Sequence, residues 1–209
     1  MPYFRKNDIN ILFIHIPKTG GTSIETYFSQ KYDIPLNYKS LYYHYPLRRK
    51  LKINSTLQHI TYKSMYKYKK ELKIKFNNIK IITIVRNPYE RIISDLFYFD
   101  KIDIKTKKDK VFTIIQKYLT QKNLDNHNIP QYKFIIDKNK NIIPNLHILH
   151  TETLTTDMNE LGFVDFNEFK NANPNKINYY KYLNNDSIQL INQFYDKDFS
   201  LFGYEKIIV

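Results

Sequence analysis

The stretch FIHIPKTGGTSIETYF (residues 13–28) decides the fold. It begins as an apolar run, breaks at Pro17, and continues with a lysine and two adjacent glycines in a chain that has only 4 glycines. The apolar spacing of a helix follows, and Thr22 with Glu25 three residues later has the pattern of a capping box. A strand that runs into such a turn and helix points several free backbone N–H groups, and the positive end of the helix dipole, at one place. The stretch therefore predicts a cradle for a phosphate or sulfate group.

The side chains of this turn fit an anion. Gly20 and Gly21 allow positive φ and a close approach of the ligand to the backbone. Lys18 adds a full positive charge. The hydroxyl donors are Thr19, Thr22 and Ser23. The turn is not a Walker loop, in which the lysine follows the glycines, because Lys18 precedes both. The alternative is a tight strand-to-helix turn with an ordinary N-cap and no ligand.

A second stretch, IITIVRNPYERIISDLFYF (residues 81–99), has the same plan. Arg86 stands at the end of a strand, Asn87 and Pro88 begin a helix, and Ser94 lies two turns into it on the side that faces the loop. A guanidinium binds a phosphate through two N–H donors, and a nearby hydroxyl can supply a third. Alternatively, Arg86 pairs with a carboxylate and Ser94 only fills space. Together the two stretches predict two anion pockets at neighbouring strand ends, where open α/β sheets bind ligands.

Hydrophobic patterning predicts an α/β fold. Three apolar runs, 9–16, 80–85 and 146–150, are typical of buried parallel strands, and each precedes a helix or loop start. Helices are expected from 22 or 23, from 88, and over 62–72, 111–121 and 186–196, with a hairpin at 134–143 and a loop at 31–57. At 209 residues we expect one domain, 1–209, with a central parallel sheet flanked by helices.

Composition limits the classes of function that the protein can have. The net charge of +13 predicts polyanionic partners, and nucleic acid, an anionic glycan and a phosphorylated small molecule all satisfy it. The absence of cysteine excludes disulfides, thiolate metal sites and a cysteine nucleophile. No run approaches the roughly 20 apolar residues of a membrane span, and no signal peptide is visible. We expect a cytoplasmic protein.

The two stretches also resemble a known family. IPKTGGTSI is similar to the 5′-phosphosulfate loop, and VRNPYERIISD to the 3′-phosphate motif, of sulfotransferases that use 3′-phosphoadenosine 5′-phosphosulfate (PAPS). The likeness is greatest to the carbohydrate sulfotransferases of the type that includes the heparan sulfate 2-O-sulfotransferases. It continues through QHITY (58–62), HNIPQYKFIID (127–137), ILHTETLTTDMNELGF (148–163) and YDKDFSLFGY (195–204), in the family's order. The resemblance implies the sulfotransferase fold, a single P-loop-like domain.

The resemblance assigns roles by position. It implies that Lys18 contacts the bridging and sulfuryl oxygens of PAPS and stabilises the departing phosphate. Arg86 and Ser94 match the pair that grips the 3′-phosphate, and His59 matches the proposed general base. The 5′-phosphate loop corresponds to Thr19, Gly20, Gly21, Thr22 and Ser23. Glu25 is our second choice of base. No metal is expected, because lysine and backbone dipoles serve instead, and His147 and His150 lack the H-E-x-x-H pattern.

The expected reaction is in-line transfer of a sulfuryl group from PAPS to a hydroxyl acceptor, and a glycan is the expected acceptor. A tyrosine or small-phenol acceptor stays open. Family members often carry a membrane anchor and cysteines that this sequence lacks, so the acceptor is not inherited from them. The alternatives are a nucleotide-dependent phosphotransferase, which the missing Walker order disfavours, and a non-catalytic polyanion-binding module, for example on nucleic acid. Selective binding of a 3′-phosphorylated adenosine nucleotide would distinguish a sulfotransferase from a phosphotransferase and from a polyanion-binding module.

Overall fold

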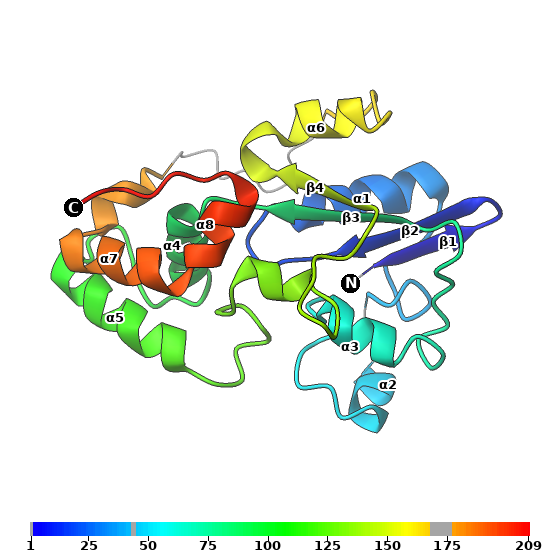
Figure 1. Cartoon of the computed structure of the whole chain (residues 1–209), viewed down its shortest axis with the longest axis horizontal. Coiled ribbons are helices and arrows are strands. Elements are labelled where there is room, and N and C mark those ends of the chain that lie inside the picture. Colours follow the sequence, from blue (N-terminus) through cyan, green and yellow to red (C-terminus); the bar gives the residue numbers. More distant parts are fainter. Residues whose placement is uncertain (1, 43–44, 168–176) are drawn as a thin grey trace.

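The computed structural model describes residues 2–42, 45–167 and 177–209, and its centre is a four-stranded mixed sheet (Figure 1). The strands, in sheet order, are β1 (Tyr3–Lys6), β2 (Ile9–Ile14), β3 (Lys80–Val85) and β4 (Leu146–His150). β2, β3 and β4 are parallel, as expected, with Phe13 beside Ile82 and Thr83 beside Ile148. β1 runs antiparallel to β2 and was not predicted from the sequence. Only the first two of its four residues are buried, so its hydrophobic period is too short to recognise.

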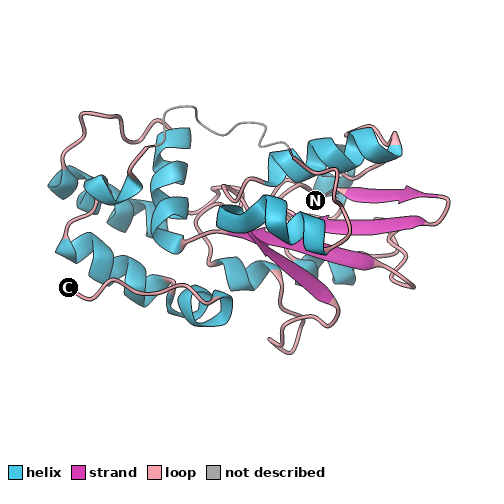
Figure 2. Ribbon diagram, turned by 90° about the horizontal axis from the view of Figure 1, so that it is seen from above, coloured by secondary structure: helices cyan, strands magenta, loops and turns pink. Residues whose placement is uncertain are grey.

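Helices and loops cover both faces of this sheet (Figure 2). On one face, Phe13 and Ile84 pack against α1 (Gly21–Tyr32) and α6 (Leu154–Glu160). On the other face, Leu12 and Val85 pack against α3 (Tyr62–Lys67) and the loops on either side of it. Because β2 and β3 are buried on both faces, their sequences are nearly continuous apolar runs, which is why they could be predicted.

A cluster of helices lies beyond the carboxyl ends of the strands and has its own apolar core, which includes Leu96, Ile115 and Ile191 (Figure 1). Its helices are α4 (Pro88–Tyr98), α5 (Lys108–Thr120), α7 (Asn185–Phe194) and α8 (Asp196–Phe202). The short elements of the chain are α2 (Tyr45–Lys50) and the 3-10 helices η1 (Gln131–Phe134), η2 (Thr151–Thr153) and η3 (Tyr179–Tyr182). The strand ends therefore open toward a second layer of helices rather than toward solvent.

Several boundaries differ from the prediction. The strands at 80–85 and 146–150 are confirmed, whereas the first strand ends at Ile14. The helix expected at 62–72 ends at Lys67, the next begins at Lys108, and the last divides into α7 and α8. The hairpin at 134–143 reduces to the single bridge Ile136–Ile142, because η1 occupies its start. The loop at 31–57 contains α2.

The helix starts were predicted with mixed success. Asn87 caps α4 by accepting from the Tyr89 N–H, and Pro88 follows it, as expected. The capping box of α1 is wrong: the helix begins at Gly21 after an N-cap at Gly20 that makes no side-chain hydrogen bond. Glu25 points into the protein instead of back to the cap. Among the described residues, no helix has the length and apolar character needed to cross a membrane.

Candidate active site

The turn after β2 is held in an unusual backbone conformation. Lys18 has φ 64° and Gly20 has φ 84°, so two of its residues lie in the left-handed region that L side chains rarely adopt. Thr19 is buried, and its hydroxyl donates to the Ile16 carbonyl at 2.8 Å. That hydroxyl stabilises the turn, and the role of Thr19 as a donor to the ligand stays a prediction. Beyond the turn, Thr22 is exposed.

The two glycines of the turn have different physical roles. Gly20 supplies the positive φ, and a Cβ there would meet only Thr151, at an ordinary 3.9 Å. A Cβ at Gly21 would lie 2.6 Å from Nε2 of His15. The second glycine therefore makes room for an imidazole ring, a neighbour that the sequence analysis did not consider. Ser23 follows in the buried first turn of α1.

Arg86 connects the second motif to the first. The amide of Gln131 brackets its backbone, accepting from the Arg86 N–H at 2.9 Å and donating to its carbonyl at 2.8 Å. The guanidinium lies over the Tyr179 ring, 4.9 Å from its centroid, and donates from Nη1 to the Lys18 carbonyl at 3.4 Å. Nη2 pairs with Glu90 at 3.0 Å, so the carboxylate partner considered above does exist. Nε is buried and has no hydrogen-bond partner among the described residues, which leaves a donor for an anion.

Lys18 contacts this arginine through its carbonyl, and Ser94 lies on α4, the helix that follows it. The Lys18 ammonium lies over the Tyr98 ring at 4.3 Å from its centroid. Burial lowers the pKa of Lys18, Asp95 opposes that shift, and the charge of Arg86 adds to it. Ser94 is half-buried on α4, and within the described part of the chain its hydroxyl makes no hydrogen bond. Both groups therefore remain available to a ligand.

Arg91, which the sequence analysis did not single out, ties the first turn to the loop after α5. Its buried guanidinium donates to the carbonyls of Pro17 at 3.0 Å, His127 at 2.6 Å and Ile129 at 3.0 Å. Three carbonyls from two distant segments thus share one cation. The position of Lys18 relative to His127 is fixed by this residue.

A row of three buried histidines lies behind the turn, and each is paired with a carboxylate. In each pair Nδ1 meets a carboxylate oxygen, at 2.5 Å for His15 and 2.7 Å for both His59 and His127. The respective partners are Glu25, Asp125 and Asp95. The rings stand edge to face, with centroids 5.1 Å apart between His15 and His59 and 4.9 Å apart between His59 and His127. Each pair joins a histidine to an acid from another part of the chain.

His59 is neutral at neutral pH. Burial lowers its pKa to about 4; the hydrogen bond that His59 donates to Asp125 opposes this shift, and the charges of His15 and His127 reinforce it. Burial by itself would raise the pKa of Asp125, but His59 and Thr56 outweigh it and leave that pKa below its usual value. The ionised carboxylate can only accept, so Nδ1 of His59 donates to it and Nε2 carries the lone pair. This is the arrangement of an oriented general base.

Glu25, the second choice of base, is enclosed. Its side chain is fully buried and accepts from His15 and from Gln58 Nε2, the latter at 3.0 Å. Burial favours a raised pKa, but the charge and hydrogen bond of His15 hold it below the usual value. This carboxylate therefore holds the His15 ring in place. Its contacts with the described residues leave it no path to an acceptor hydroxyl.

Comparison with known proteins agrees with this geometry. The model of the sulfotransferase family (family 2) matches residues 1–205. The chain belongs to the sulfotransferase family. Searches of curated proteins and of solved structures found no significant match. Membership means an enzyme that transfers a sulfuryl group from a sulfonate donor to an acceptor, and the α/β structure fits the sulfotransferase fold.

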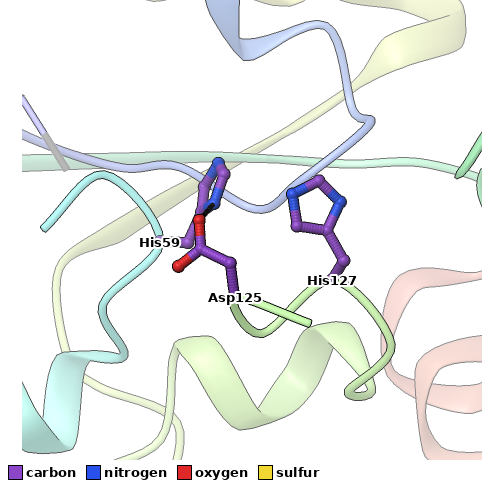
Figure 3. Close-up of side chains that lie close together, drawn as sticks. All are labelled: His59, Asp125 and His127. Carbon is purple, nitrogen blue, oxygen red and sulfur yellow. Dashed lines mark hydrogen bonds and ion pairs between the residues drawn. The ribbon is translucent and has the colours of Figure 1, made fainter. Parts of the chain in front are cut away.

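One feature of this sulfotransferase was not expected from its sequence. Across the described ranges, one group of side chains can hold a metal ion: ligand atoms of His59, Asp125 and His127 lie within 4.8 Å of one another. Figure 3 shows the two imidazoles and the carboxylate converging from the loop before α3 and the loop after α5. His147 and His150, weighed from the sequence, lie on β4 and form no such group.

Two surface hollows of the sulfotransferase lie away from the two motifs. One of about 610 Å³ is lined by residues of the β1–β2 turn and by Lys69, Lys70 and Lys75, and another of about 630 Å³ adjoins it. This turn precedes β2, whereas the Lys18 turn follows it. The hollows are therefore at the opposite end of the strands from the motifs and are not part of the candidate active site.

Proposed function

We propose that the protein transfers the sulfuryl group of PAPS to a carbohydrate hydroxyl. One observation carries the proposal: the Arg86 guanidinium reaches the Lys18 carbonyl and keeps a buried Nε donor that no other described residue engages. Two anion-binding motifs that are 68 residues apart thus meet at neighbouring strand ends. PAPS has two anionic ends, the 3′-phosphate and the 5′-phosphosulfate, which suits two such motifs.

The donor would be held by residues of both motifs. Arg86 and Ser94 offer the buried Nε and a hydroxyl to the 3′-phosphate. The turn of Lys18, Thr19, Gly20, Gly21, Thr22 and Ser23 would surround the 5′-phosphosulfate at the start of α1. Negative charge grows on the 5′-phosphate as the S–O bond breaks, and the half-buried Lys18 ammonium would stabilise it there.

The acceptor would be deprotonated by His59. As the acceptor oxygen bonds to sulfur, its proton would pass to Nε2, while Nδ1–H remains on the Asp125 carboxylate. The imidazolium formed in this way would lie beside an ionised partner, which stabilises it. No metal takes part in this proposal, because Lys18 and the helix N-terminus supply the positive charge.

The charge distribution supports an anionic glycan as acceptor. Residues 48–80, which flank His59 on both sides, contain eleven Lys or Arg against the single acid Glu71. That segment carries ten of the thirteen net positive charges, and it includes α3 and the second half of α2, which lie on one side of the sheet (Figure 1). A carbohydrate with carboxylate or sulfate groups would be attracted to this surface and led to the base.

Calorimetry with adenosine 3′,5′-bisphosphate tests the donor site. We expect tight binding of the bisphosphate, much weaker binding of AMP and ATP, and a loss of affinity in Arg86→Ala. The matched control is Arg5→Ala, an exposed arginine on β1. Equal binding of all three nucleotides, falling steeply with salt, would indicate a basic surface without a specific pocket. Labelled PAPS offered with neutral and anionic glycans then tests the acceptor.

A further inference from the structure

The group formed by His59, Asp125 and His127 has the donors of an open zinc site. Two imidazole nitrogens and one carboxylate oxygen are the ligands that catalytic zinc sites use, with the fourth position left to water or substrate. All three side chains are at least half-buried, and their ligand atoms lie within 4.8 Å of one another. Figure 3 shows the three side chains close to one another.

Hydrogen bonds with neighbouring residues hold His127 and Asp125 in place, as is usual for metal ligands. His127 donates from Nδ1 to Asp95 at 2.7 Å, and Asp95 also accepts from the buried Tyr118 hydroxyl. Asp125 accepts from the backbone N–H and the hydroxyl of Thr56. Metal-binding histidines usually donate their other ring N–H to a carboxylate in this way, which fixes the ring and leaves Nε2 for the ion. The support for His127 is thus already in place.

We propose that Zn²⁺ binds between His59, Asp125 and His127 and blocks sulfuryl transfer. Ligand atoms around a tetrahedral zinc with bonds of about 2.0–2.1 Å are about 3.4 Å apart, so these side chains must close by up to about 1.4 Å. Nδ1 of His59 and Oδ2 of Asp125 are 2.7 Å apart and must open by about 0.7 Å to admit the ion, so the closure falls on His127. The ion takes the place of the proton on Nδ1, and Nε2 takes up a proton in exchange, so the ring stays neutral and no net proton is released.

The inhibition follows from the chemistry of the ring. A neutral imidazole with its Nδ1 bound to a metal carries its hydrogen on Nε2, and it then has no lone pair for an acceptor proton. Asp125 is drawn to the metal at the same time and no longer orients the ring. The binding is independent of the proposed function, whereas the inhibition rests on the proposed role of His59 as base.

Titration of the full chain, freed of metal with a chelator, tests the binding. Zn²⁺ is followed by calorimetry, and Co²⁺ by the visible absorption of a low-coordinate site. We expect one ion per chain, at least 10-fold weaker binding in both His127→Gln and Asp125→Asn, and unchanged binding in the control His147→Gln on β4. Thermal melts verify that the variants fold. Wild-type protein with no saturable Zn²⁺ binding, or His127→Gln binding as tightly as wild type, would overturn the site.

Activity separates the two parts of the proposal. We expect Zn²⁺ to stop sulfuryl transfer, a chelator to restore it, and the affinity for adenosine 3′,5′-bisphosphate to stay the same. Saturation with Zn²⁺ without loss of transfer would overturn the inhibitory role. Absence of transfer to any acceptor in metal-free protein would count against the proposed function, while the calorimetric and Co²⁺ results would still decide the metal site.

Discussion

Replacement of Gly21 by alanine should destabilise this protein, although glycine-to-alanine changes in helices usually do the opposite. Gly21 is the first residue of α1, and its φ is not in the left-handed region. At such a position alanine normally stabilises by about 0.4–1 kcal/mol, because it restricts the unfolded chain. Here the new Cβ would lie 2.6 Å from Nε2, 2.7 Å from Cδ2 and 2.8 Å from Cε1 of His15.

The His15 ring has little freedom to move away. Its Nδ1 is 2.5 Å from Glu25 and 3.2 Å from Gln58, and the His59 ring stands 5.1 Å away. Overpacking of a filled interior costs about 1–3 kcal/mol, which exceeds the gain from alanine. A net loss of about 1–2 kcal/mol lowers the melting temperature of a chain of this size by about 2–8 °C. Transfer should fall as well, since displacement of His15 disturbs the row that contains His59.

A double-mutant cycle tests this reasoning by calorimetric melting. In a His15→Ala background the clash disappears, so Gly21→Ala should cost far less, with a coupling of at least about 1 kcal/mol. The control is Gly162→Ala, which has φ 90° and nothing within 4 Å of its Cβ, so its cost is backbone strain alone and should add to that of His15→Ala. A higher melting temperature for Gly21→Ala than for wild type would refute the argument, as would an additive cycle.

Four further predictions concern the donor site and His59. Arg86→Ala should weaken binding of adenosine 3′,5′-bisphosphate by about 10–100-fold in calorimetry, because charged hydrogen bonds contribute about 1.5–3 kcal/mol; an unchanged affinity would contradict the assignment. Lys18→Ala should reduce transfer of labelled sulfuryl by at least about 100-fold without unfolding the protein, and undiminished turnover would overturn the mechanism. With a pKa of about 4 for His59, kcat/KM measured with chelator should hold down to about pH 5, and an acid limb near 6.5 would count against this base. Because the unfolded histidine is protonated below about 6.5 and the folded one is not, His59 also makes stability rise with pH between about 4 and 6.5; thermal melts of wild type and His59→Gln measure this.

The sequence predicted those features of the protein whose pattern lies within one short segment of the chain. The strands at 80–85 and 146–150, the cap at Asn87 and the family itself were predicted correctly because hydrophobic period, turn chemistry and motif order are read along the chain. β1 was missed because four residues give too short a pattern. The capping box of α1 was wrong because Glu25 has a better partner in His15, which a helix pattern does not reveal.

The histidine–carboxylate pairs were decided only by tertiary structure. His59 and Asp125 are 66 residues apart, and His127 and Asp95 are 32 apart, so no local spacing marks them as partners. Sequence named His59 as a base through family resemblance, but its orientation and its lowered pKa come from burial beside two other imidazoles. The order of residues fixes which side chains a segment can offer. Packing of distant segments at the ends of parallel strands decides which of them meet, because the free energy of a buried charge depends on the neighbours that the fold gives it.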